Sequence, residues 1–311
     1  MTKEFSRPTG IAVLLFRRPH YASRLLDSLA AALDWSLWKD VHFFVDGPCD
    51  FFRNYVSPTP DPAQTLEASE VIVDLVKSRF GNDANIHHSP WNLSSSLQFI
   101  GAFEYLFHAK NFDRTIVLEE DIELHPKFFE IMNLLLDLYE HNSRVGVVGG
   151  FGEKYESRDG PQRLEMTTMS HWLGVGWWKE KYEEYYGPIL RSFQRDSVSQ
   201  YRRDPIRRDC TQNSDGSPQG NSFFSWDLEC QRASASQGLV PLVPWANFVS
   251  YLGEEGENAG DDYYKHCGFG LMKLWDKATP SKADMCRLLS INDTTLHELV
   301  NRYRNNTAHL F

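Results

Sequence analysis

Short, continuous apolar runs alternate with longer amphipathic segments through the first 150 residues, and this alternation limits the folds open to the chain. The apolar runs are short enough for strands, and the segments between them repeat apolar residues at helical spacing. Uninterrupted apolar runs are typical of parallel strands buried on both faces. The sequence therefore predicts an α/β fold with a doubly wound, mostly parallel sheet. The expected strands are 10–16, 41–45, 86–88, 116–118 and 145–148, and the expected helices are 19–33, 65–80, 94–109 and one begun by Pro126.

The pattern changes after about residue 150, where segments become shorter and richer in glycine and aromatic residues. We expect residues 1–150 to form one α/β half and residues 151–270 the other half of the same domain. A helical tail is expected over 271–311. The polar stretch 187–222 carries a basic cluster, Arg202, Arg203, Arg207 and Arg208. It is interpreted as a solvated loop, with binding of an anionic acceptor or a mobile lid as the alternative.

Charge and cysteine content argue against several classes of protein. The net charge of −10 and the pI near 5.6 disfavour binding of nucleic acid through a basic surface. No run approaches the roughly 20 apolar residues that span a membrane, and the N-terminal residues lack the apolar core of a secretion signal. The five cysteines are typical of a reducing compartment, although a Cys210–Cys230 disulfide stays an alternative. We expect a cytoplasmic protein, working in solution or at a membrane surface.

Three adjacent carboxylates follow the fourth predicted strand. The apolar run Ile116–Leu118 ends at Glu119, Glu120 and Asp121. Carboxylates at the end of a buried strand are costly unless a cation meets them. Ligands of open α/β sheets bind beyond the carboxyl ends of the strands, and hard oxygen ligands suit Mg²⁺ or Mn²⁺. The triad therefore predicts a metal-bridged, phosphate-bearing substrate, as in a transferase.

The turn after the first predicted strand lacks a glycine-rich phosphate loop. It reads Phe16-Arg17-Arg18-Pro19, with neither a Gly-x-Gly-x-x-Gly fingerprint nor a Walker loop. This argues against a dinucleotide-dependent dehydrogenase and against a P-loop kinase. Arg17 and Arg18 could meet a phosphate or pair with the acidic triad, and Arg17 is our candidate for binding the phosphate-bearing ligand. A plain surface position is the alternative.

Five short motifs, in order along residues 10–260, resemble those of a known enzyme family. The triad and the Pro-Lys-Phe-Phe after it resemble the DXD-type motif of GT-A glycosyltransferases, and most nearly the Glu-Asp-Asp motif of the N-acetylglucosaminyltransferase I family. The resemblance implies a GT-A fold, with the nucleotide sugar bound by residues 1–150 and the rest of the site in 151–270. It also implies a nucleotide-diphosphate sugar as donor, with UDP the expected nucleotide. The other four motifs are at 44–47, 172–178, 224–227 and 243–256.

The resemblance implies a role for each member of the triad. Asp121 would bind the Mn²⁺ or Mg²⁺ that bridges the donor diphosphate. Glu120 would face the ribose or the metal, and Glu119 would accept hydrogen bonds from the donor sugar or a basic residue. The metal would stabilise the charge that develops on the leaving nucleoside diphosphate. A solvated loop at the two glutamates is the alternative.

Further donor-binding residues are implied on three other motifs. Asp46 would hold the uracil or ribose, with a simple Asp-Gly-Pro turn as the alternative. Segment 172–178 resembles the glycine-aromatic loop that shapes the donor-sugar pocket, where Gly174 and Gly176 would let the backbone approach the donor beside Trp177. An aromatic-rich turn in the core is the alternative there. Trp226 would pack on the face of the sugar or the acceptor.

Asp227 is the expected general base. A carboxylate that takes the proton of an attacking hydroxyl gives direct displacement with inversion at the sugar carbon. The implied reaction transfers a hexosyl or N-acetylhexosaminyl group to a glycan or glycoconjugate. A helix cap is the alternative role for Asp227, and Glu229 is the rival base.

The sequence departs from the family pattern in two places. The triad is Glu-Glu-Asp rather than Glu-Asp-Asp, and segment 256–260 lacks the His of many members, with Asp261 and Asp262 following it. Two other functions therefore stay open, a nucleotidyltransferase and a non-catalytic carbohydrate-binding protein on a degenerate transferase fold. The absence of glycine from the turn after the first strand disfavours the nucleotidyltransferase.

Overall fold

The structure is a computed structural model that describes six parts of the chain. These are residues 7–50, 62–152, 164–169, 171–192, 226–254 and 264–308, the last with gaps at 266, 268, 270–271, 273 and 277–279. Most of the polar stretch 187–222, the first two residues of motif 224–227, and both Asp261 and Asp262 lie outside the described residues.

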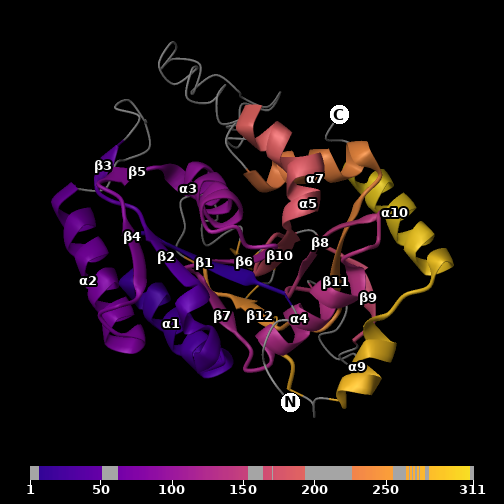
Figure 1. The fold of residues 1–311 in the computed structure, drawn as a ribbon, viewed down its shortest axis with the longest axis horizontal. Coiled ribbons are helices and arrows are strands. Elements are labelled where there is room, and N and C mark those ends of the chain that lie inside the picture. Colours follow the sequence, from indigo (N-terminus) through magenta and orange to yellow (C-terminus); the bar gives the residue numbers. More distant parts are fainter. Residues whose placement is uncertain are drawn as a thin grey trace.

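An eight-stranded sheet forms the centre of the molecule, in the order β4-β2-β1-β6-β10-β8-β11-β9 (Figure 1). Strands β4, β2, β1 and β6 are parallel, as are β8 and β11, whereas β10 and β9 run antiparallel to their neighbours. The predicted α/β fold with a mostly parallel sheet is therefore confirmed. The strands are β1 (Thr9–Leu15), β2 (Val41–Val45), β4 (Asn85–His88), β6 (Arg114–Glu119), β8 (Val145–Gly149), β9 (Met166–Thr168), β10 (Val175–Trp178) and β11 (Val240–Pro244).

Helices cover both faces of this sheet (Figure 1). One face carries α1 (Pro19–Ala32), α2 (Pro62–Phe80) and α4 (Phe128–Tyr139). The other face carries α3 (Ser94–Glu104), the π-helical turns η2 (Tyr105–Ala109) and η4 (Tyr182–Tyr186), and α7 (Trp226–Gln237). Successive residues of β1 enter opposite cores, as Val13 and Leu14 do. The apolar runs are continuous because both faces are buried.

The five strands expected in the first 150 residues correspond to β1, β2, β4, β6 and β8, so β9, β10 and β11 of this sheet were not among them. β10 lies antiparallel between β6 and β8, with Val175 opposite both Val117 and Gly149. The predicted loop over 172–178 was therefore wrong from Val175 onward. Its β-branched and aromatic residues suit a strand, but a run of four residues is too short for its pattern to separate a strand from a loop.

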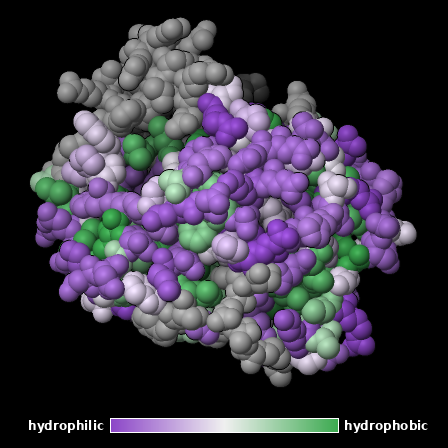
Figure 2. Space-filling view, viewed as in Figure 1, coloured by the Kyte–Doolittle hydropathy of each residue, from purple (hydrophilic) through white to green (hydrophobic). Residues whose placement is uncertain are grey.

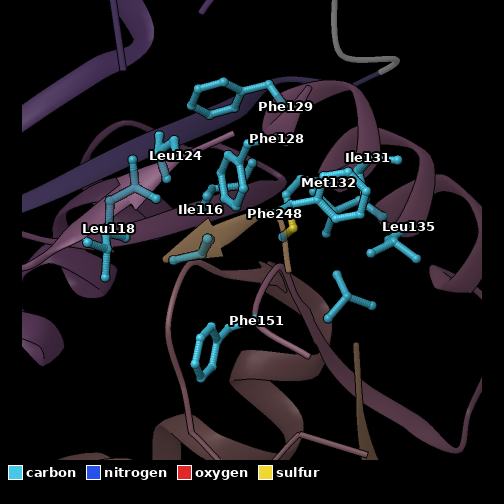
Figure 3. Close-up of a cluster of buried hydrophobic side chains, with 14 of the residues drawn as sticks. Ile116, Leu118, Leu124, Phe128, Phe129, Ile131, Met132, Leu135, Phe151 and Phe248 are labelled. Atoms are coloured by element: carbon cyan, nitrogen blue, oxygen red, sulfur yellow. The ribbon is translucent and has the colours of Figure 1, made fainter. Parts of the chain in front are cut away.

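Helix α4 fixes the position of β6. The Arg114 guanidinium, which is 1% exposed, donates to Asp137 Oδ1 (2.6 Å) and Glu140 Oε2 (2.9 Å) at the end of the helix. These contacts secure the start of the strand, and apolar packing secures the remainder (Figure 3). The buried cluster contains Ile116 and Leu118 of β6, Phe128, Phe129, Ile131, Met132 and Leu135 of α4, and Leu124, Phe151 and Phe248.

The chain turns at Glu120 and Asp121, from β6 into a second, two-stranded sheet. There β7 (Ile122–Leu124) pairs antiparallel with β12 (Val249–Tyr251). The Leu252 N–H donates to the carbonyl of Asp121 (2.7 Å), and the Leu124 N–H donates to the Ser28 hydroxyl of α1 (3.0 Å). The turn that carries the acidic residues is therefore held on both sides.

The remaining elements are short or peripheral. Two residue pairs, β3 (Cys49–Asp50) and β5 (Trp91–Asn92), form a small parallel sheet beyond β2. The predicted helical tail contains α9 (Lys282–Leu289) and α10 (Asp293–Thr307), and α10 begins with the Asn292 side chain accepting from the Thr295 N–H (2.8 Å). Two other short helical segments are η1 (Trp35–Asp40) and α5 (Lys179–Lys181).

Hydrophilic residues predominate on the face shown in Figure 2, where hydrophobic residues lie in small separate groups. Among the helices that the structure describes, none is both long and apolar enough to cross a membrane.

We expect Arg114→Ala to lower the free energy of unfolding by about 3 kcal/mol, because it leaves two carboxylates beside the core without their buried partner. The matched control is Arg144→Ala, whose Nη2 meets Asp293 Oδ1 (2.6 Å) at the surface, with the Asp293 side chain 96% exposed. Its loss should cost less than about 1 kcal/mol. Denaturant unfolding of both variants measures the difference, and equal costs would contradict the role given to Arg114.

Candidate functional site

The carboxyl ends of three central strands bring the acidic residues together. Leu14 of β1 lies beside Glu119 of β6, and Leu15 lies beside Val45 of β2. Asp46, which follows Val45, is therefore close to the turn after β1 and to the triad. This edge of an open α/β sheet is where ligands usually bind.

Arg18 bridges two members of the triad. Its Nε donates to Glu120 Oε1, and its Nη2 donates to Asp121 Oδ2 over 2.9 Å. Burial by itself would lower the pKa of Arg18, but the charges of Glu120 and Asp121 outweigh this effect and raise it. The guanidinium therefore stays charged and neutralises part of the acidic cluster.

Glu120 is the most firmly held of these side chains. Its Oε2 accepts from the Phe16 N–H (2.7 Å), while Oε1 accepts from Arg18. Desolvation raises the pKa of Glu120, and the Arg18 charge opposes that rise. The carboxylate thereby ties the turn after β1 to the end of β6.

The arginine at the centre of the site is Arg18, whereas Arg17 was the candidate from sequence. The Arg17 guanidinium lies over the Phe16 ring, with Cζ 5.5 Å from the ring centroid. The two arginines are neighbours in sequence, and the direction in which the chain leaves β1 determines which one reaches the triad. Donor binding by Arg17 stays a prediction.

Asp46 is buried at the end of β2, with 3% of its surface exposed. Its Oδ2 accepts from the Leu93 N–H (2.8 Å). Desolvation raises the pKa of Asp46 to about 8, in spite of that hydrogen bond and with a contribution from the Glu120 charge. The carboxyl group is thus largely protonated at neutral pH and could donate a hydrogen bond to a ligand.

Gln98 is a residue that sequence reasoning missed. It is 7% exposed, and its Nε2 donates to the carbonyls of Leu15 (3.2 Å) and Phe44 (3.0 Å). These two hydrogen bonds join the ends of β1 and β2 beside Asp46. The signal was a glutamine between Leu97 and Ile100, on the apolar part of a predicted helix.

Asp227 reaches the same cluster from the other half of the chain. It lies in the first turn of α7, and its charge contributes to raising the pKa of Glu119, after desolvation and the Asp121 charge. Glu229, two residues further along, instead accepts from Arg232 Nη1 (2.7 Å) within the same helix. The structure thus relates Asp227, rather than its rival, to the triad.

The tryptophan beside Asp227 is a core residue. Trp226 is 5% exposed, and its ring stacks on that of Phe99 with centroids 3.5 Å apart. This packing anchors the first turn of α7. Contact between the Trp226 ring and a donor stays a prediction, and the burial of the ring gives that contact no support.

The glycines of 172–178 have packing roles. Gly174 has φ +60°, and a Cβ there would lie 2.7 Å from Val249 Cγ2. A Cβ on Gly176 would lie 2.8 Å from Met132 Cε of α4. Trp177 is fully buried among aromatic rings. These positions match the alternative of an aromatic-rich core, and donor contacts by the two glycines and Trp177 stay predictions.

The carboxylate oxygens of the acidic cluster are the kind of ligand that suits a hard divalent cation. Arg18 brings one positive charge to the cluster, and the pKa of Glu119 is nevertheless raised, first by desolvation and then by the charges of Asp121 and Asp227. In the described parts of the chain, no group of three or more His, Cys, Asp or Glu side chains is arranged to hold a metal ion. Mg²⁺ needs few protein ligands where substrate phosphates complete its coordination. Five carboxyl groups take part in the cluster, those of Asp46, Glu119, Glu120, Asp121 and Asp227.

Several solved structures resemble this one at low similarity. S. aureus TarS 1–349 is 12% identical with a TM-score of 0.44, and the match covers 97% of this chain and 72% of that one. The same fragment in complex with UDP-GlcNAc has the same identity and TM-score, with 97% and 73% covered. The mannosyltransferase PcManGT from Pyrobaculum calidifontis, solved with GDP-Man and Mn²⁺, is 8% identical with a TM-score of 0.39, covering 99% and 75%.

Such low identities and TM-scores do not by themselves assign an activity to this chain. No protein-family model matches it, and no curated protein matches it. The particular likeness to the N-acetylglucosaminyltransferase I family therefore stays a prediction from the sequence motifs.

The wild-type protein should lose stability as the pH rises from about 5 to about 8, and we expect Asp46→Asn to lose less. The folded protein keeps Asp46 protonated up to about pH 8, whereas an unfolded aspartate releases its proton near about 3.9. The unfolded state binds fewer protons in this interval, so the free energy of unfolding falls as pH rises. Asparagine does not titrate, so it removes this pH dependence, and its side-chain oxygen can still accept from the Leu93 N–H.

Denaturant midpoints of wild type and variant at both pH values measure the effect. Asp27→Asn is the matched control, because its hydrogen bond from Arg79 lowers the Asp27 pKa and keeps that carboxylate ionised at both values. A difference between wild type and Asp46→Asn that does not change with pH would contradict the expectation.

Proposed function

We propose that this protein is an inverting glycosyltransferase. It would transfer a hexosyl or N-acetylhexosaminyl group from a nucleotide-diphosphate sugar, with UDP the expected nucleotide, to a hydroxyl of a glycan or glycoconjugate. The observation that carries the proposal is the meeting of the Glu119-Glu120-Asp121 turn, Asp46 and Asp227 at the carboxyl edge of the sheet.

Asp46 suits the nucleoside of such a donor, and the turn Glu120-Asp121 with Arg18 suits its diphosphate. Asp46 lies on the nucleotide side in the motif resemblance, and a protonated Asp46 can donate to a base or ribose oxygen. The turn Glu120-Asp121 lies between the main sheet and the β7–β12 sheet. A diphosphate placed there would be close to Arg18, whose guanidinium matches phosphate oxygens.

Asp121 is the proposed ligand for Mn²⁺ or Mg²⁺. Its side chain is 13% exposed, compared with 4% for Glu120, so it is the more accessible of the two carboxylates. When bound, the metal would offset the negative charge that builds up on the departing nucleoside diphosphate. Glu120 keeps the turn in place through Phe16 and Arg18.

Asp227 is the proposed general base. It lies in the first turn of α7, where Trp226 fixes the helix by stacking on Phe99. After desolvation and the Asp121 charge, the Asp227 charge contributes to the raised pKa of Glu119, and this interaction supports a base near the proposed sugar side of the site. Proton transfer from the acceptor hydroxyl to this carboxylate as the hydroxyl attacks the sugar carbon gives inversion.

The first test is thermal-shift screening of UDP-, GDP- and dTDP-sugars with and without Mn²⁺. A ligand that binds only the folded state raises the melting temperature, and we expect a UDP-sugar with Mn²⁺ to give the largest rise. Asp121→Asn should remove the Mn²⁺-dependent part of the shift. A full Mn²⁺-dependent shift in that variant would exclude Asp121 as the ligand.

The second test separates binding from chemistry. Asp227→Asn should keep the donor-induced shift but lose roughly 10²–10⁴-fold in nucleoside diphosphate release, the usual contribution of a general base. Glu229→Gln, in the same helical turn, is the matched control and should keep most activity. Activity lost in Glu229→Gln and kept in Asp227→Asn would reverse the assignment. Pyrophosphate as the product would instead indicate a nucleotidyltransferase.

A further inference from the structure

Arg18 joins two carboxylates that are held with different firmness. Both oxygens of Glu120 are engaged, one by Arg18 Nε and the other by the Phe16 N–H. Asp121 receives the Nη2 arm of Arg18 at 2.9 Å through Oδ2, and its side chain is about three times as exposed as that of Glu120, at 13% against 4%. Asp121 is therefore the partner that can exchange.

A divalent cation on Asp121 would meet Arg18 at short range. Mg²⁺ binds carboxylate oxygens at about 2.0–2.1 Å, and Arg18 Nη2 already lies 2.9 Å from Asp121 Oδ2. Like charges this close repel, and a site whose carboxylates are mostly buried is screened less than the surface. Each of the two cations therefore weakens the binding of the other to Asp121.

The bond to Glu120 keeps Arg18 at the site when Asp121 is taken. Glu120 is anchored by the backbone of Phe16, so the planar guanidinium can pivot about its Nε contact and carry Nη2 away from Asp121. A guanidinium held at one end in this way remains beside the metal site and can present its donors to a phosphate. The geometry therefore allows exchange without loss of the arginine.

We propose that Arg18 is a built-in counter-ion that competes with a divalent cation for Asp121, with Glu120 as the positioning residue that retains it. The inference rests on the proposed function, from which it takes Asp121 as the metal ligand. Arg18 neutralises the carboxylates when no metal is bound. The same contact makes the metal affinity of the site weaker than that of the carboxylates without Arg18.

Titration calorimetry with Mn²⁺, in the absence of nucleotide, tests the competition. Arg18→Gln should tighten Mn²⁺ binding on the order of tenfold, equivalent to about 1.4 kcal/mol, and Asp121→Asn should abolish binding. Arg24→Gln is the matched control, since it removes the same charge from α1 at a residue that pairs with Glu123 (2.6 Å) instead. Its Mn²⁺ affinity should change by less than about twofold, because long-range surface charge is screened.

Arg18→Lys keeps the test decisive if Arg18→Gln fails to fold. Lysine keeps a positive charge for Glu120, but a single ammonium group cannot reproduce the planar fork that reaches two carboxylates. Its Mn²⁺ affinity should lie above that of wild type and below that of Arg18→Gln. Unchanged or weaker Mn²⁺ binding by the folded Arg18 variants, or no Mn²⁺ binding by any protein in the series, overturns the competition.

The competition and the glycosyltransferase proposal fail in different measurements. A nucleotide sugar that raises the melting temperature equally with and without Mn²⁺ supports the glycosyltransferase proposal. A calorimetric titration that detects no Mn²⁺ binding excludes the competition by Arg18. Tight Mn²⁺ binding that responds to Arg18→Gln, together with no response to any nucleotide sugar, supports the competition and overturns the proposed function.

Discussion

The ion pair of Arg18 with Glu120 and Asp121 is the interaction on which the candidate site depends. Both carboxylates follow the apolar run Ile116–Leu118 after one intervening residue, Glu119, and the fold buries most of their surface. Uncompensated, two such charges would oppose the turn that carries them. The guanidinium, together with the Phe16 N–H, makes this turn compatible with a packed core and links β1 to β6 at their carboxyl ends.

The surrounding architecture keeps that edge rigid. Helix α4 packs under β6, and Arg114 ties the start of the strand to the end of this helix. The β7–β12 sheet receives the chain directly after the acidic turn and holds the Asp121 carbonyl through Leu252. Gln98 joins β1 to β2 on the side of Asp46. These contacts hold together a sheet edge that receives acidic groups from distant parts of the chain.

Aromatic residues serve mainly the core behind the site. Trp177 and Trp226 pack with Phe99 and Phe103 between the sheet and α7, and Gly174 and Gly176 allow close packing against Phe128, Val249 and α4. The sequence motifs suggested ligand contacts for these residues, since aromatic rings and glycines near a sheet edge suit either purpose. Their burial shows that they support the position of Asp227 and of β10. A pattern of residue types does not distinguish a ring that faces a ligand from one that faces a helix.

The sequence by itself determined the order and type of the first elements and the place of the acidic triad, because apolar runs and helical spacing are local and record burial on both faces. It also indicated that a cation must meet the triad, since the charge cost of Glu119-Glu120-Asp121 follows from the residues alone. Tertiary structure decided that Arg18 rather than Arg17 meets it, that β10 enters the sheet beside β6, and that Asp227 lies near Glu119. Each of these depends on how separate elements pack and on where the chain turns after a strand. Residue type and spacing do not encode these directions, because they arise only when the distant segments share one core.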